Sequence, residues 1–140
     1  IIVGQDTDGS MTPFDMGLGG MVSKTKTDFV GKRSLSRIDI VAEGRKQLVG
    51  LLTTDPQEVI PEGSHLLNEP TKEYPAPMLG FASSSYFSPN TNTSIAMALV
   101  KGGLDRMGDT IYAARSDGSF IECRITSPVF FDKEGARQHA

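Results

Sequence analysis

The sequence predicts a mainly β fold: a small antiparallel β-barrel or jelly-roll-like domain preceded by a short α/β piece. In residues 44–140, short apolar runs recur at spacings of about ten residues, with no long helical pattern between them. Asp117-Gly118, between two of these runs, is typical of a hairpin, because Asp-Gly accepts the positive φ that primed turns need. Residues 1–43 differ, since they combine turn-rich stretches with two short helical signals.

The N-terminal piece opens with turn-forming residues and then carries a helix start. Thr12 suits the N-cap and Pro13 the first helical position, while Asp15 stands three residues after the cap, close to a capping box. Gly17 and the glycines that follow predict that this helix is short.

The rest of this piece predicts a brief strand over 21–23 and a second short helix over 31–39. Residues 42–46 are charged and contain Gly44, which makes them the best candidate for a domain boundary. We therefore expect one unit over 1–43 and a second over 44–140.

The second unit reads as a series of strands bounded by proline, glycine and Asp-Pro breaks. The expected strands cover residues 47–54, 65–67, 78–87, 94–100, 110–115 and 120–126, with 129–131 closing the set.

Composition excludes several classes of function. The net charge of −3, with charges of mixed sign, argues against a nucleic-acid-binding surface. No apolar run approaches the roughly 20 residues of a membrane span. The single cysteine, Cys123, cannot form an internal disulfide, so a cytoplasmic location is expected. Because the chain starts at Ile1 without an initiator Met, we expect it to be a piece of something longer.

Residue chemistry alone predicts no catalytic residue and no metal site. His65 and His139 are far apart, and no Cys or carboxylate joins either with metal-ligand spacing. Residues 6–10 resemble a calcium loop but lack its third acidic position and terminal Glu. There is no nucleophile elbow, Walker loop or dinucleotide-binding glycine pattern.

Two features remain as candidate ligand contacts. Guanidinium groups suit carboxylates and phosphates, and Arg33 belongs to a basic cluster with Lys32, Arg37 and Arg45. Tyr86, at the end of a predicted strand, could stack on a flat ring, although packing into the barrel is the commoner fate of such a side chain.

Four phrases, in order along the chain, resemble one family. They are residues 4–8 with 12–13 and 17–19, residues 28–35, residues 46–51, and residues 80–89 and 94–100 closed by 126–130. These phrases resemble the folate-dependent aminomethyltransferases, the glycine-cleavage T-proteins. The details of 31–35, 44–52, 84–89 and 128–137 resemble the alpha subunits of heterotetrameric sarcosine oxidases, which contain the same fold.

The resemblance implies the end of a folate-binding module followed by the family's C-terminal barrel. In such an oxidase, sarcosine is oxidatively demethylated to glycine, tetrahydrofolate captures the one-carbon unit as methylenetetrahydrofolate, and oxygen yields hydrogen peroxide. The implied partners are the remainder of the alpha subunit and the other subunits, with flavin and NAD bound outside this chain. We therefore expect the chain alone to be inactive.

The site residues that the resemblance implies are few. The family's catalytic Asp and its folate-binding Glu and Arg correspond to positions before Ile1, so no catalytic residue is assigned. Arg33, Tyr86 and Arg137 are the folate-adjacent candidates. Two alternatives stay open: a fragment of a T-protein or dimethylglycine dehydrogenase, or an assembly domain without ligand contact.

Overall fold

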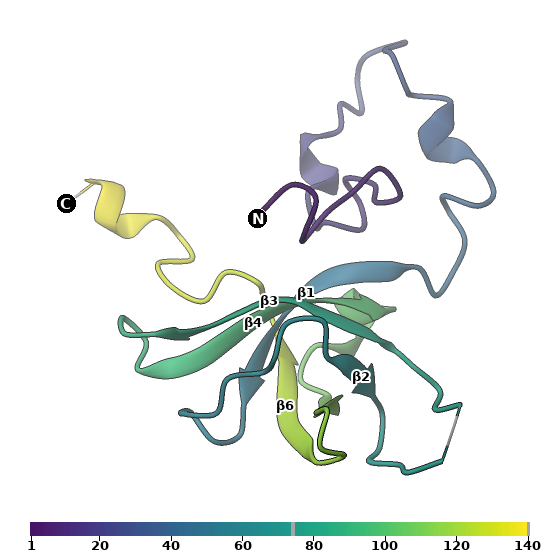
Figure 1. Cartoon of the computed structure of the whole chain (residues 1–140). Coiled ribbons are helices and arrows are strands. Elements are labelled where there is room, and N and C mark those ends of the chain that lie inside the picture. The colour runs from purple at the N-terminus through teal and green to yellow at the C-terminus, as the bar shows by residue number, and fades with distance from the viewer. Residues whose placement is uncertain (74, 140) are drawn as a thin grey trace.

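A closed barrel of six antiparallel strands forms the centre of the computed structural model, which describes residues 1–73 and 75–139 (Figure 1). The strands are β1 (Lys46–Thr53), β2 (His65–Leu67), β3 (Gly80–Ser88), β4 (Thr93–Lys101), β5 (Thr110–Ala114) and β6 (Phe120–Thr126). They follow the order β1-β4-β3-β2-β5-β6, and β1 closes the ring by pairing with both β4 and β6. The mainly β prediction is confirmed, and the architecture is a barrel.

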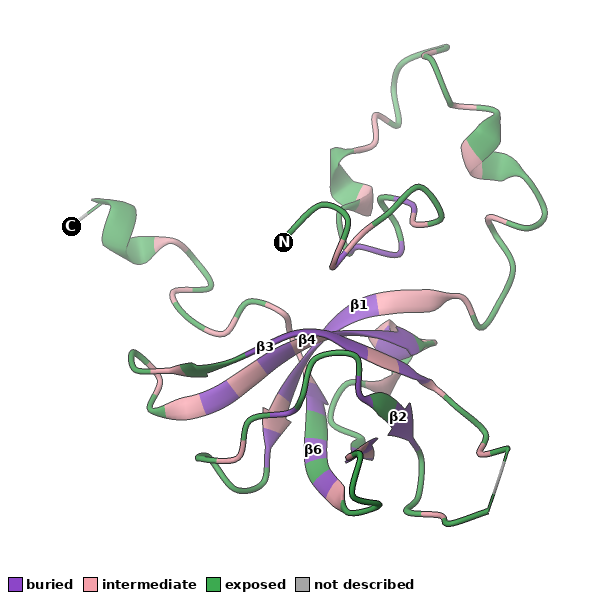
Figure 2. Cartoon of the chain, viewed as in Figure 1, coloured by how far each residue is buried: buried purple, intermediate pink, exposed green. Residues whose placement is uncertain are grey.

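The core lies inside this barrel, where alternate residues of the strands meet. On β4, Ala96, Ala98 and Val100 point inward and are buried, while Met97 and Leu99 face the outer side. Figure 2 shows buried residues running along β3 and β4 where these strands cross the barrel. Alternation of this kind is the period-2 signal from which the strands were predicted.

The connection between β5 and β6 is the predicted Asp-Gly hairpin. Arg115 N donates to Ser119 O at 2.9 Å, and Asp117 Oδ1 accepts hydrogen bonds from the backbone N–H and hydroxyl of Ser119. Among residues 115–119, only Gly118 has a positive φ, of 82°. The hairpin is confirmed, but its turn is a longer loop with one left-handed residue rather than a two-residue primed turn.

Residues 1–45 cover the outer face of the sheet formed by β1, β4 and β3 (Figure 1). Met16 packs against Leu48 and Leu99, and Leu48 N donates to the carbonyl of Asp15 at 2.8 Å. This covered face explains why Leu99, which points out of the barrel, is nevertheless buried.

The two helices predicted in this segment do not form. The segment instead contains turns and two short 3-10 helices, η1 (Gly19–Met21) and η2 (Ser34–Ser36). Gly17 and Gly31 take positive φ angles of 70° and 92°, which a right-handed helix cannot include. Arg37 is extended after η2 and ends it after three residues.

The predicted strand at 21–23 and the closing strand at 129–131 are also absent from the part of the chain that the structure describes. The barrel closes through the pairing of β1 with β6, so no open edge remains for residues 129–131 to pair with. Two further 3-10 helices are η3 (Gly103–Arg106) and η4 (Ala136–His139). Within residues 1–73 and 75–139, no helix has the length and apolar character needed to cross a bilayer.

Candidate functional site

A shallow groove of about 370 Å³ lies where the N-terminal residues, the outer face of β3 and β4, and the tail after β6 meet. We call it the Tyr86 groove. It is lined by Ile1, Ile2, Ser84, Tyr86, Ile95, Ala96, Met97, Pro128 and Phe130. The groove therefore brings together three segments that are far apart in the sequence, and most of its wall is apolar.

Tyr86 gives the groove its polar group. It sits near the end of β3 and is 55% exposed, so its ring is available to a ligand. The negative charge of Glu62 is the main cause that raises the pKa of the Tyr86 hydroxyl, followed by partial desolvation and a hydrogen bond with Glu62. Glu62 is held in place because the backbone N–H of Ser85 donates to it at 3.3 Å. Tyr86 therefore offers a flat face and a neutral phenol.

The N-terminal side of the groove is fixed by Asp6. Its Oδ1 accepts hydrogen bonds of 2.6 Å from the hydroxyls of Ser83 and Ser84, and its Oδ2 accepts one of 2.7 Å from Ile2 N. Gln5 Nε2 donates to the carbonyl of Ser83 at 2.7 Å. These bonds hold Ile2 against the barrel.

These hydrogen-bond partners offset the free-energy cost of burying the Asp6 carboxylate. The side chain is fully buried, and burial by itself would raise the pKa of the carboxyl. The hydrogen bonds from Ser83, Ser84 and Ile2 outweigh that effect, so the pKa lies below its usual value. Asp6 is an ionised anchor whose oxygens are already occupied, not a free general base.

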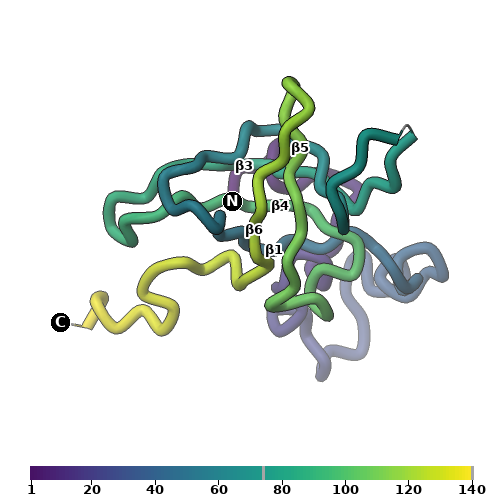
Figure 3. Tube along the Cα trace, turned by 90° about the horizontal axis from the view of Figure 1, so that it is seen from below, coloured from purple at the N-terminus to yellow at the C-terminus, as the bar shows by residue number. Residues whose placement is uncertain are grey.

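The structure separates the three residues that the sequence singled out. Tyr86 lines the groove, whereas Arg33 is exposed just before η2. Arg137 is exposed in η4, with its guanidinium carbon 4.8 Å from the ring centroid of Phe131. Figures 1 and 3 place residues 31–40 and η4 on opposite sides of the molecule, so Arg33 and Arg137 are not brought together.

Sequence reasoning missed Asp6, Glu62 and Phe130 as parts of this site. One signal was present: three consecutive serines, residues 83–85, in the middle of a predicted strand. The register of β3 and β4 shifts between Ala82 and Ser84. This bulge turns Ser83 and Ser84 toward the same carboxylate.

The groove lacks the groups of a self-contained reactive centre. In residues 1–73 and 75–139, no three His, Cys, Asp or Glu side chains are grouped closely enough to hold a metal ion. Cys123 is buried inside the barrel, where desolvation raises the pKa of its thiol to about 12. Such a thiol is not a nucleophile at neutral pH.

A folate would fit this groove only in part. The exposed face of Tyr86, with Ile2 and Phe130 beside it, suits one planar ring system. The nearest buried carboxylate, Asp6, is already hydrogen-bonded. The residues described here thus fit one wall of a folate site. They do not fit flavin or NAD, because no glycine-rich phosphate loop lies between a strand and a helix.

Comparison with known proteins adds independent findings. Residues 46–132 match the model of the glycine cleavage T-protein C-terminal barrel domain. The chain is 42% identical over 140 residues to the sarcosine oxidase subunit alpha of Corynebacterium sp. (strain U-96). This alignment covers 99% of this chain and 14% of that protein. It is 38% identical over 135 residues to the subunit alpha of Rhizobium meliloti (strain 1021), covering 96% of this chain and again 14% of the relative.

Aminomethyltransferases are similar at lower identity. That of Desulfitobacterium hafniense (strain DSM 10664 / DCB-2) is 32% identical over 138 residues, covering 96% of this chain and 34% of the relative. The crystal structure of glycine cleavage system aminomethyltransferase T from Bartonella henselae superposes with a TM-score of 0.71 at 23% identity, over 91% of this chain and 34% of that one. At that identity the superposition supports the shared barrel fold alone. The chain spans 14% of the sarcosine oxidase relatives it matches.

Proposed function

Because the chain belongs to the glycine cleavage T-protein C-terminal barrel family, we propose that it acts as the barrel of a sarcosine oxidase alpha subunit. In the proposed reaction, sarcosine, oxygen and tetrahydrofolate give glycine, hydrogen peroxide and methylenetetrahydrofolate. The observation that carries the proposal is the 42% identity over nearly the whole chain to a protein of that name.

We assign residues 1–43 to the end of the folate-binding module and residues 44–140 to the barrel. The contacts between the two are direct: Asp15 and Met16 pack on β1 and β4, and Asp6 is buried against β3. A barrel joined to residues 1–43 by these contacts suits the role of a wall beside a ligand.

In this proposal the Tyr86 groove is the folate-facing part of the chain. Tetrahydrofolate supplies the amine that accepts the one-carbon unit. Tyr86 contributes a flat face for stacking, and its phenol, which donates to Glu62, can accept a hydrogen bond through its oxygen. Ile2 and Phe130 add apolar surface beside that face, and a bound folate would complete the exclusion of water that a water-sensitive one-carbon intermediate needs.

Arg137 is the candidate for the carboxylate end of the folate. It lies on the tail whose Phe130 lines the groove, and its guanidinium is exposed. A guanidinium binds a carboxylate through two parallel hydrogen bonds, which a lysine cannot reproduce. Arg33 lies on the opposite side of the molecule, so the proposal gives it no role in the groove.

The test uses the longer protein that contains this chain, expressed with its partner subunits. We expect sarcosine-dependent peroxide release, and methylenetetrahydrofolate when tetrahydrofolate is added. Tyr86→Ala should raise the KM for tetrahydrofolate about tenfold, which is about 1.4 kcal/mol, and leave folate-independent peroxide release unchanged. Tyr112→Ala is the matched control, because Tyr112 is a half-buried tyrosine of β5 that does not line the groove.

Each outcome separates the alternatives. Folate-dependent transfer from an aminomethyl donor without any peroxide would favour an aminomethyltransferase, and preference for dimethylglycine would favour the related dehydrogenase. If Tyr86→Ala and Tyr112→Ala behave alike, the groove is not the folate wall.

An assembly role is supported by a different observation. Several large apolar side chains of residues 1–45 are strongly exposed, among them Val3 (87%), Met21 (81%) and Ile38 (89%). Exposed apolar side chains gathered on one segment are typical of a surface that another protein covers. Titration of the chain with tetrahydrofolate distinguishes the two roles: saturable binding tighter than about 1 mM contradicts a purely structural one.

A further inference from the structure

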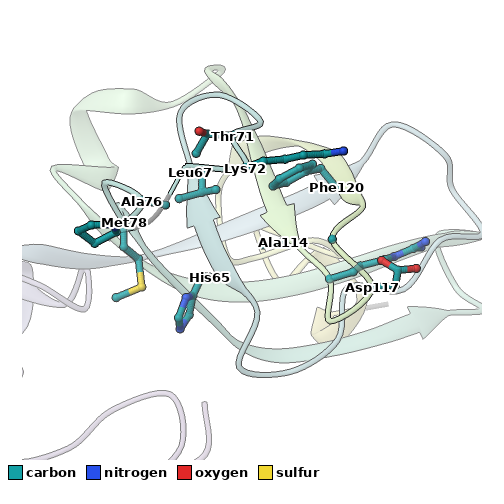
Figure 4. Close-up of a pocket in the computed structure, with 12 residues that line it drawn as sticks. His65, Leu67, Thr71, Lys72, Ala76, Met78, Ala114, Asp117 and Phe120 are labelled. Atoms are coloured by element: carbon teal, nitrogen blue, oxygen red, sulfur yellow. The ribbon is translucent and has the colours of Figure 1, made fainter.

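A second and larger hollow, of about 660 Å³, opens at the side of the barrel that faces away from residues 1–45 (Figures 1 and 4). Three segments bound it: β2, the loop that follows β2, and the hairpin between β5 and β6. Its lining residues are His65, Leu67, Thr71, Lys72, Pro75, Ala76, Met78, Ala114, Arg115, Asp117, Gly118 and Phe120. We call it the hairpin pocket. It shares no lining residue with the Tyr86 groove.

The wall of the hairpin pocket is mainly apolar. Leu67 is 4% exposed and Phe120 is half-buried, while Met78 is 36% exposed beside them. Figure 4 shows these side chains drawn from different segments around one hollow. A volume of this size and an apolar wall with a few polar groups are typical of small-molecule sites, which span about 300–1,000 Å³.

The polar groups of the pocket differ in how far they are already engaged. Arg115 forms an ion pair with Glu58, and Asp117 Oδ1 accepts two hydrogen bonds from Ser119. Lys72 is exposed at the rim and forms no ion pair with any residue in the part of the chain that the structure describes. Of the two basic residues named here, Lys72 is therefore the one whose cation remains available to a ligand.

Thr71 also lines the pocket, but Figure 4 shows its hydroxyl and the Lys72 ammonium pointing away from each other. Thr71 Oγ1 accepts a hydrogen bond from Glu73 N at 3.1 Å, which leaves its own proton free to donate. The free ammonium of Lys72 favours an anionic acceptor. The apolar wall of the pocket favours a hydrocarbon or aromatic body.

We propose that the hairpin pocket binds a small organic carboxylate with a flat apolar body, its carboxylate at Lys72 and its body against Leu67, Met78 and Phe120. This site is separate from the folate wall proposed above, because it lies on the other side of the barrel. A negative result for the hairpin pocket would therefore not affect the folate-wall proposal, and a negative result for the folate wall would not affect the hairpin pocket.

The probe is 2-naphthoate, titrated into the ¹⁵N-labelled chain and followed by amide chemical shifts. We expect saturable shifts confined to residues 65–78 and 114–120. 2-Naphthalenemethanol, which has the same ring but no charge, should bind more weakly. Lys72→Gln should weaken naphthoate about fivefold to tenfold and leave the alcohol unchanged, the effect of one partly exposed ion pair.

A second variant tests the apolar wall without disturbing the core. Met78→Glu places a negative charge in the wall and should abolish naphthoate binding. Met107→Glu is its matched control, because Met107 is 44% exposed and lies outside the pocket. Naphthoate shifts that map elsewhere, equal binding of the uncharged alcohol, or equal behaviour of the two methionine variants would each overturn the proposal.

Discussion

The Oδ1 atom of Asp6 accepts a 2.6 Å hydrogen bond from the hydroxyl of Ser83, and this bond joins the first loop of the chain to the bulge in β3. Ser84 donates to the same atom, so two consecutive serines share one buried acceptor. A regular strand would point these two side chains to opposite faces, and the bulge is what lets both reach Asp6.

Replacing Asp6 should therefore detach the loop. Asp6→Ala leaves the hydroxyl of Ser84 without its acceptor and that of Ser83 with only the Met97 carbonyl, 3.2 Å away, and we expect the free energy of unfolding to fall by about 2–3 kcal/mol. Urea denaturation measures this loss. Asp8→Ala is the control on the same loop, because the Asp8 side chain is exposed and its hydrogen bonds are local, to Ser10. If both variants unfold at the same urea concentration, the anchor does not stabilise the chain.

Acid should weaken the same contacts. Burial would raise the pKa values of Asp6 and Asp15, but their hydrogen bonds outweigh it, and for Asp15 the leading favourable partner is Arg45. Folded-state pKa values below the unfolded value mean that the stabilisation is complete above about pH 4 and is lost as the pH falls through the folded pKa. We expect the free energy of unfolding to decline below about pH 4.

Substitutions distinguish the contribution of Asp6 and Asp15 to this acid destabilisation from that of the other carboxyl groups. Asp6→Asn and Asp15→Asn should each reduce the slope of this decline in urea titrations at stepped pH. Glu134→Gln, on the exposed tail, should keep the wild-type slope. Identical slopes in all three variants would show that the buried carboxylates do not set the acid limit.

Arg45 connects the two units that the sequence analysis separated. Its guanidinium lies 2.6 Å from the carboxylate of Asp15 and also donates to the carbonyls of Ser10 and Asp39. Arg45→Ala should lower the free energy of unfolding by about 1–2 kcal/mol, because the Asp15–Arg45 pair is mostly buried but its arginine side chain is 22% exposed. Hydrogen exchange should quicken in residues 1–45 and stay unchanged in the barrel.

Arg37→Ala is the matched control for Arg45. The pair of Arg37 with Asp39 has side chains that are 66% and 58% exposed, so its loss should have little effect. Faster exchange in the Arg37 variant than in the Arg45 variant would contradict the assignment.

Gly80 marks the closest approach of two strands. A Cβ at this position would lie 1.8 Å from the carbonyl oxygen of Leu99, which is backbone and cannot move aside. Gly80→Ala should therefore destabilise the barrel by about 3 kcal/mol or more, seen in thermal or urea unfolding. Gly20→Ala should have little effect, since a Cβ there meets no atom within 4 Å. Equal stability of the two variants would contradict the close approach of β3 and β4.

The predictions from local pattern succeeded where one face of a segment is buried. The alternation of β4 and the Asp-Gly hairpin before β6 gave the strands and their antiparallel order. In residues 1–45 the same approach gave helices that do not form, because that segment is stabilised by contacts with the barrel and not by its own periodicity. The capping-box bonds between Thr12 and Asp15 do form, but no helix follows them.

By itself, the sequence determined the β-rich class and the aromatic candidate Tyr86, because strand periodicity and side-chain chemistry are local properties that can be read residue by residue. Only the tertiary structure decided that Asp6 is an anchor, that Phe130 joins Tyr86 in one groove, and that Arg33 and Arg137 are apart. Those relationships depend on barrel closure and on a single bulge in β3. Asp6 and Ser84, which are 78 positions apart, meet only after the chain has closed on itself, and no local pattern records such a distance.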